Sequence, residues 1–122
     1  MSAPLRKPKL LERVLFAIEE SGWQALIVGR SHPFLLRVFK REHQGVLNLR
    51  IYIWNCTHGG KNRAEDEYRV QITGVVPEAQ KDETTLLLGW HEGYNVFVGF
   101  DIRKHKGQAS ASPGFKSEVQ LS

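Results

Sequence analysis

Cysteine is almost absent from this chain of 122 residues. Only Cys56 is present, so no internal disulfide bond can form. It ends an apolar stretch, where a small buried thiol is more common than a nucleophile. No pair of the five histidines has the spacing of a zinc motif, and we expect no structural zinc. The reducing cytosol suits such a chain, so we expect a cytoplasmic protein.

Long apolar runs are also missing. No segment approaches the ~18 apolar residues of a membrane helix, and the N-terminal residues MSAPLRKPK lack the apolar core of a signal peptide. No glycine-rich phosphate loop of the Walker or dinucleotide type occurs. We therefore expect neither a membrane partner nor a cofactor.

The composition is that of a globular protein, with 41% hydrophobic and 25% charged residues. The net charge of +4 is compatible with nucleic-acid binding and equally with a slightly cationic protein that needs no such partner. The length allows one domain with a modest core. We expect a flexible basic arm over residues 1–8, a single domain over 9–109, and a polar tail over 110–122 that is either a linker or a last strand.

The longest patterned stretch runs from Val46 to Gln71. Its first half alternates aliphatic residues with residues of a second kind: Leu47, Leu49, Ile51 and Ile53 against Asn48, Arg50, Tyr52 and Trp54. Side chains point alternately to the two faces of a strand, so one face is aliphatic and needs a core. The other face carries rings and a guanidinium group, which suit flat, negatively charged ligands.

The remaining segments predict one helix and several more strands. Helical spacing of apolar residues spans Lys9 to Ser21, and Gly22 is a C-terminal stop. Strand patterns are also present at 24–28, 34–40, 68–73, 84–90 and 95–103, with short turns between most of them. The fold class is therefore α+β and mainly β: a strongly curved antiparallel sheet or partial barrel, with the N-terminal helix packed on it.

Two segments carry candidate binding chemistry. The glycine-rich loop at 58–63 brings backbone N–H groups, Lys61 and Arg63 within reach of phosphates, although it can equally be a solvated turn. Asp101 faces out of an apolar strand and can accept hydrogen bonds from the amino group of cytosine. Aromatic residues near it can stack on a base taken out of the helix: Trp90, Tyr94 and Phe97. A capping role for Asp101, and a small core for the rings, are the ordinary alternatives.

Four segments together resemble a known family: IYIWNCTHGG, DEYRVQITGV, LLLGWHEGYNVFVGFDIRKH and SASPGFKSEVQ. The resemblance is to the N-terminal specificity domain of bacterial modification-dependent restriction endonucleases, an SRA-like domain that flips 5-methylcytosine. It implies a curved sheet that receives the everted base, with Asp101 on the cytosine edge and Trp90 or Tyr94 on its face. Gln71 on a neighbouring strand would read a second edge atom. The nuclease would be a separate domain of the parent chain.

The first hypothesis is therefore a non-catalytic domain that recognises double-stranded DNA carrying modified cytosine, within a restriction endonuclease. Base contacts would come from Trp90, Asp101, Tyr94, Gln71 and Phe97. Contacts to DNA phosphates would come from the basic residues Arg50, Lys61, Arg63, Arg69, Arg103, Lys104 and His105.

Two alternatives belong to other classes. A small metal-dependent nuclease would use the carboxylates of Glu65, Asp66, Glu67 and Asp101, although no lysine stands at the expected place after Glu67. A protein-interaction module would present the aromatic row to a partner.

Overall fold

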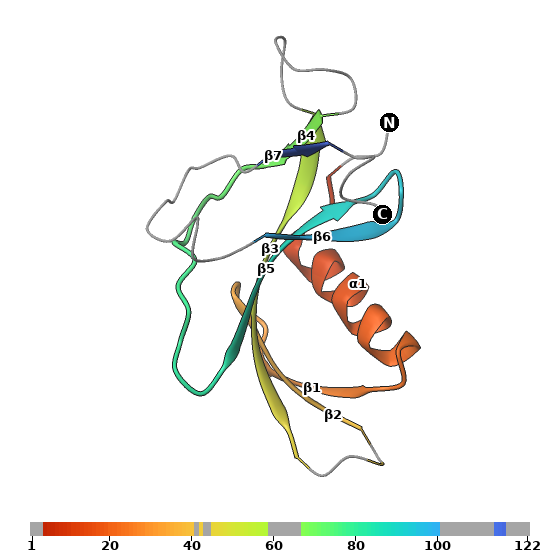
Figure 1. Cartoon of the computed structure of the whole chain (residues 1–122), viewed down its shortest axis with the longest axis vertical. Coiled ribbons are helices and arrows are strands. Elements are labelled where there is room, and N and C mark those ends of the chain that lie inside the picture. The colour runs from red at the N-terminus through yellow and green to blue at the C-terminus, as the bar shows by residue number, and fades with distance from the viewer. Residues whose placement is uncertain (1–3, 41, 43–44, 59–66, 101–113, 117–122) are drawn as a thin grey trace.

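The computed structural model describes residues 4–40, 42, 45–58, 67–100 and 114–116. One helix and seven strands follow in chain order: α1 (Lys7–Glu20), β1 (Gln24–Gly29), β2 (Phe34–Phe39), β3 (Leu47–His58), β4 (Glu67–Val70), β5 (Thr84–His91), β6 (Val96–Phe100) and β7 (Gly114–Lys116) (Figure 1). The α+β class is confirmed. β7 lies in the segment predicted as a linker or last strand.

Five strands form the main sheet in the order β1-β2-β3-β5-β6, and the far end of β3 also pairs with β4, which pairs with β7. All pairs are antiparallel except β3 and β5, which are parallel, with Ile51 beside Leu86. The prediction of a strongly curved antiparallel sheet or partial barrel is therefore wrong, because the sheet is mixed and open. Residues 71–83 carry the chain back along the sheet, so β5 starts beside the start of β3 (Figure 1).

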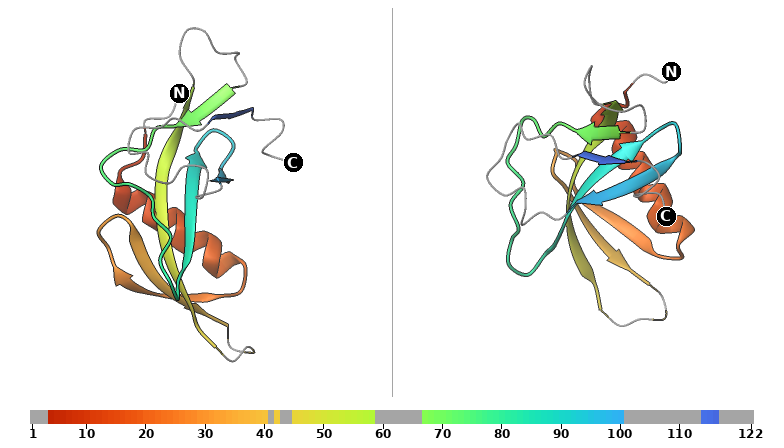
Figure 2. Two further views of the ribbon diagram at one scale, coloured as in Figure 1. Left: turned by 60° about the vertical axis from the view of Figure 1, so that its left-hand side comes forward. Right: turned by 45° about the horizontal axis from the view of Figure 1, so that its top comes forward.

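The first core lies between α1 and one face of the sheet, as the views of Figure 2 show. Its buried residues come from the apolar stripe of the helix and from three strands, and include Leu10, Leu11, Val14, Phe34, Leu36, Ile51 and Ile53. The predicted helix is confirmed, and so is the aliphatic face of β3 over Leu49, Ile51 and Ile53, whereas Leu47 at its start is 48% exposed. The predicted stop is also present: Gly22 has a φ of +90°, and its N–H donates to the carbonyl of Glu19.

A second core covers the opposite face of the sheet. It contains Tyr52 and Trp54 of β3, Leu87 of β5, Val70 at the end of β4, and Ile72 two residues after it, all of which are buried. The sequence predicted that the face with Tyr52 and Trp54 would be free for a ligand, and for these two residues that is wrong. β3 is a central strand, and central strands are commonly covered on both faces.

A hydrogen-bonded ion pair joins β3 to the residue before β5. Arg50 donates from Nε and Nη2 to the two carboxylate oxygens of Glu83, at 2.6 and 3.1 Å. These hydrogen bonds raise the pKa of Arg50, so the guanidinium keeps its charge. The pair clamps the long 71–83 connection to the sheet.

We expect the Arg50–Glu83 pair to stabilise the fold by about 1 kcal/mol, because it is bidentate and its side chains are only 22% and 24% exposed. A double-mutant cycle with Arg50→Ala and Glu83→Ala, read by urea unfolding, measures this coupling. The exposed pair Lys9–Glu12 on α1 is the matched control, with an expected coupling of about 0.3 kcal/mol. Equal couplings for the two pairs would show that Arg50–Glu83 is no clamp.

No helix within the described residues has both the length and the apolar character of a membrane span.

Candidate functional site

A groove of about 610 Å³ opens between α1 and the end of the β5–β6 hairpin. Its lining comes from both elements and includes Arg13, Phe16, Glu20, Trp90, Asn95 and Phe97. Protein sites for small ligands commonly have volumes of this order and a mainly apolar lining with a few polar groups. The groove is therefore the first place to look for a ligand.

The base of the groove is a fixed aromatic pair. The rings of Trp90 and Phe97 lie 4.7 Å apart between centroids, tilted by 58°. The indole N–H of Trp90 donates to Glu92 at 2.8 Å, and the Arg13 guanidinium lies 5.7 Å from the centre of the Trp90 ring. Arg13 also approaches Glu92 at 3.7 Å. These contacts fix the position of the Trp90 ring, and the residue is only 3% exposed to solvent.

The rim of the groove offers an exposed ring and polar groups. Phe16 on α1 is 63% exposed, although it is a large apolar residue. Glu20 and Asn95 are also exposed, and the φ of Asn95 is +55°. A carboxylate and an amide can accept from and donate to the edge of a heterocycle, while aromatic rings contact its face.

The turn beside the groove is held by a histidine. The ring of His91 is buried, and its Nδ1 accepts a hydrogen bond from the Tyr94 backbone N–H at 3.1 Å. Burial lowers the pKa of His91, which favours the neutral ring that this hydrogen bond needs. The Tyr94 ring lies 4.7 Å from that of His91 and is 55% exposed.

Of the five predicted base contacts, the structure brings Trp90 and Phe97 together in the groove, with Tyr94 in the adjoining turn. Trp90 is a core residue here, so Phe97 and Phe16 offer the more accessible rings. Gln71 is exposed and follows β4, next to the second core. Asp101 lies outside the described residues.

Among the predicted phosphate contacts, Arg50 is engaged with Glu83, so a phosphate would have to compete with that carboxylate. The backbone of Arg69 lies in β4, where it pairs with Thr57 and Gly114. The other five lie outside the described residues: Lys61, Arg63, Arg103, Lys104 and His105.

The nuclease alternative rests mostly on residues of the same kind. Glu65, Asp66 and Asp101 lie outside the described residues, and Glu67 contributes its backbone to β4. Among the residues that the structure describes, no three or more histidine, cysteine or acidic residues are grouped so that they could hold a metal ion.

A second polar cluster surrounds the backbone of Ile53. His32 Nε2 accepts a hydrogen bond from the Ile53 N–H at 2.8 Å, and Lys7 Nζ donates to the Ile53 carbonyl. Lys7 also lies 4.6 Å from the centre of the Trp54 ring. Burial lowers the pKa of Lys7 to about 8. Burial and the charge of Lys7 lower the pKa of His32 to about 3, so His32 is neutral near neutral pH.

Sequence reasoning missed the contribution of the helix to the groove, namely Phe16 and Glu20, and that of Asn95. One signal was available: Phe16 lies outside the apolar stripe formed by Leu10, Leu11, Val14 and Ile18. A single exposed apolar residue is common on protein surfaces, so this signal is informative only together with the aromatic residues of the β5–β6 hairpin.

The helix, the sheet and the groove define a small α+β domain with a ligand-sized groove between its two layers. Residues 47–121 match the Methylase-associated X1 (MTaX1) family, and this match covers more than half of the chain. The chain belongs to this family, whose domains are associated with DNA methylase systems of the restriction-modification type. No curated protein and no solved structure gives a significant match.

The family membership supports the coarser part of the sequence prediction, a domain of a DNA-modification system. It does not confirm the finer part, an SRA-like domain of a restriction endonuclease. The match begins at the start of β3, so it includes Trp90, Asn95 and Phe97 on one wall of the groove. The helix wall, with Phe16 and Glu20, precedes it.

Proposed function

We propose that this domain recognises DNA for a methylation system, and that its groove receives a cytosine-type base taken out of the helix. The observation that carries the proposal is the groove itself, in which aromatic rings, a carboxylate and an amide converge. The family association with DNA methylase systems supports DNA as the class of ligand.

The chemistry of the groove fits a modified cytosine. Phe16 and Phe97 supply ring surface for the face of the base and for a 5-methyl group. Glu20 can accept a hydrogen bond from the N4 amino group of cytosine, the role that the sequence assigned to Asp101. The excess of Lys and Arg over Asp and Glu, 17 against 13, favours an anionic partner.

The test is a titration with labelled duplexes of one sequence that carry cytosine, 5-methylcytosine or adenine at one position. We expect the 5-methylcytosine duplex to bind most tightly. Phe97→Ala should weaken its binding about tenfold, because stacking of one base on an aromatic ring contributes ~1–3 kcal/mol. Glu20→Ala should weaken the binding of the cytosine duplexes, because it removes the proposed acceptor for the N4 amino group. Fluorescence anisotropy at several salt concentrations measures all of these affinities.

Val76→Ala is the matched control, because Val76 is an exposed apolar residue in the 71–83 connection and does not line the groove. It should bind like the parent. Trp90→Ala is unsuitable, since removal of this core ring would lower the free energy of unfolding by about 3–5 kcal/mol. If Phe97→Ala keeps the affinity and preference of the parent, the groove is not the base site. If no duplex binds at all, the DNA function is wrong and a protein-interaction module remains.

A further inference from the structure

Strand β1 is an edge of the sheet whose regular part, Gln24–Ile27, carries no charge and no proline, and whose one protective feature is a register shift at its end. It is the first strand in the sheet order and pairs only with β2 among the described residues (Figure 1). Natural edge strands commonly carry a lysine, a proline or an inward-pointing charge that prevents pairing with another strand. The sequence of β1, QALIVG, has none of these. Its one irregularity is a register shift between Ile27 and Gly29, which leaves Gln24–Ile27 regular.

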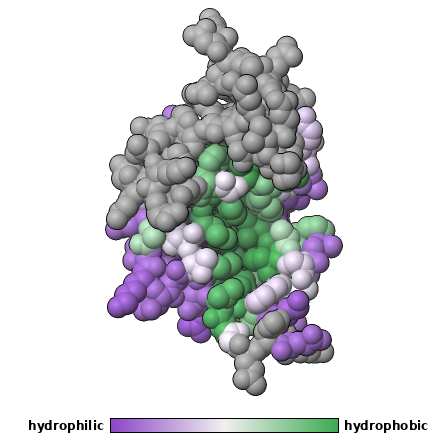
Figure 3. Space-filling model, in the orientation of Figure 1, coloured by the Kyte–Doolittle hydropathy of each residue, from purple (hydrophilic) through white to green (hydrophobic). Residues whose placement is uncertain are grey.

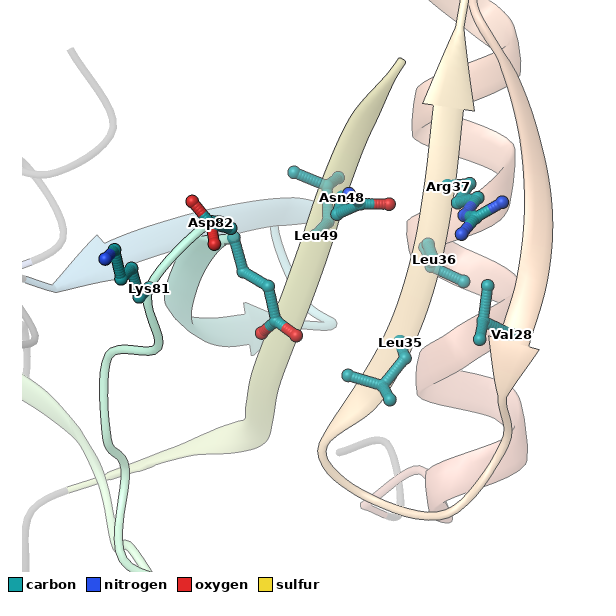
Figure 4. Close-up of a pocket in the computed structure, with 9 residues that line it drawn as sticks. Val28, Leu35, Leu36, Arg37, Asn48, Leu49, Lys81 and Asp82 are labelled. Atoms are coloured by element: carbon teal, nitrogen blue, oxygen red, sulfur yellow. The ribbon is translucent and has the colours of Figure 1, made fainter.

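The face of β1 that points away from α1 is apolar and open. Leu26 is 57% exposed and Val28 is 59% exposed. Val28 lines a hollow of about 300 Å³ together with Leu35, Arg37, Asn48 and residues 81–83 (Figure 4). Figure 3 shows a long apolar stripe on one face of the molecule, between hydrophilic borders. Exposed apolar surface beside a free strand edge is typical of an association site.

We propose that β1 pairs with the β1 strand of a second copy of this chain, across a two-fold axis, to form one continuous sheet. An antiparallel self-pairing centred on Leu26 places Leu26 opposite its own copy, Ala25 opposite Ile27, and Gln24 opposite Val28. The Leu26 pair and the two Ala25–Ile27 pairs then bring apolar side chains together on the two faces of the sheet, Gln24 meets Val28 at the register shift, and no like charges meet.

This self-complementarity favours a second copy over an unrelated partner. β1 contains no charged residue, and uncharged Gln24 and Gly29 stand at its two ends. Two identical edges can therefore meet without electrostatic repulsion. Pairing would satisfy the backbone N–H and C=O groups on the β1 edge that pair with no strand among the described residues, and it would bury Leu26 and Val28 of both copies. The pairing does not involve the groove, so it is independent of the proposed DNA function.

The first experiment measures the oligomeric state of the full chain by sedimentation equilibrium over a wide concentration range. We expect a dimer that dissociates on dilution. Leu26→Lys should be a monomer, because it places two ammonium groups opposite each other at the centre of the pairing. Val76→Lys adds the same charge at another exposed apolar position and should remain dimeric. Because Leu26 is more than half exposed, circular dichroism should show both variants folded.

The second experiment tests the register of the pairing. Leu26→Cys should form a disulfide-linked dimer under mild oxidation, because directly opposed residues of an antiparallel pair have Cα atoms about 4.5–5.5 Å apart, within reach of a disulfide. Cys56 should not interfere, since burial raises its pKa to about 12. Val76→Cys is the control and should stay reduced. A parent chain that remains monomeric at millimolar concentration, or equal cross-linking of the two variants, would overturn the proposal.

Discussion

Alanine at position 89 is expected to lower the free energy of unfolding by about 2 kcal/mol, although glycine is normally unfavourable in a strand. A methyl group on Gly89 would lie 2.6 Å from Val70 Cγ2 and 2.8 Å from Cys56 Sγ. Both distances are shorter than van der Waals contact, and Val70 is fully buried in the second core. The neighbours must therefore shift to make room. Urea unfolding, monitored by tryptophan fluorescence, measures this decrease in the free energy of unfolding.

Gly99→Ala is the matched control on the adjacent strand β6. A methyl group on Gly99 would meet no atom within 4 Å. Its stability should stay within about 0.5 kcal/mol of the parent, or rise slightly, because alanine restricts the unfolded chain more than glycine does. If Gly89→Ala is as stable as Gly99→Ala, then the packing of β4 against β5 is looser than the structure indicates.

Local patterns were sufficient to predict the elements of this fold. The helix, its stop at Gly22 and the strands of the main sheet all follow from short-range periodicity and turn residues. The aliphatic face of β3 was also correctly assigned to a core, because Ile51 and Ile53 pack beneath α1. These features depend on residues close together in the chain.

The direction and neighbours of β5 could not be obtained in the same way. Residues 77–83 have the polar composition of a surface loop, and nothing in the sequence indicates that the 71–83 connection runs the length of the sheet. A short loop would have given an antiparallel neighbour, as the sequence predicted. The long return instead makes β5 parallel to β3, and it brings Ile72 over Tyr52 and Trp54. The expected binding face was lost for that reason.

The same long-range effect governs the candidate site. Trp90 and Phe97 were identified because rings near an acidic residue suggest base binding. Their partners on α1, Phe16 and Glu20, lie 70 to 81 residues earlier in the chain. Only the packing of α1 over β5 and β6 brings Phe16 and Glu20 to the groove. A single sequence gives residue types and local periodicity, but not which distant faces meet.

His32 should make the stability of the domain depend on pH in the acid range. Its pKa is lowered from 6.5 to about 3 in the folded protein, first by burial and then by the charge of Lys7. Between these values the unfolded chain binds a proton that the folded chain does not, so stability must fall as the pH falls. In the folded protein, His32 Nε2 accepts a hydrogen bond from the Ile53 N–H. Protonation would put a hydrogen on Nε2, so two N–H groups would then face each other.

We expect this residue alone to account for about 2 kcal/mol of lost stability between about pH 7 and about pH 4. The full shift would give more, but water reaches part of the ring and screens it. His32→Gln can still accept the Ile53 hydrogen bond through Oε1 and does not titrate, so its stability should fall less over the same range. Urea unfolding of both proteins at the two pH values isolates the effect, because all other titrating groups are shared. Lys7→Met, which removes the neighbouring charge, should raise the pKa of His32 in an NMR titration. Parallel pH profiles for the parent and His32→Gln would show that His32 is protonated as readily in the folded protein as in the unfolded chain.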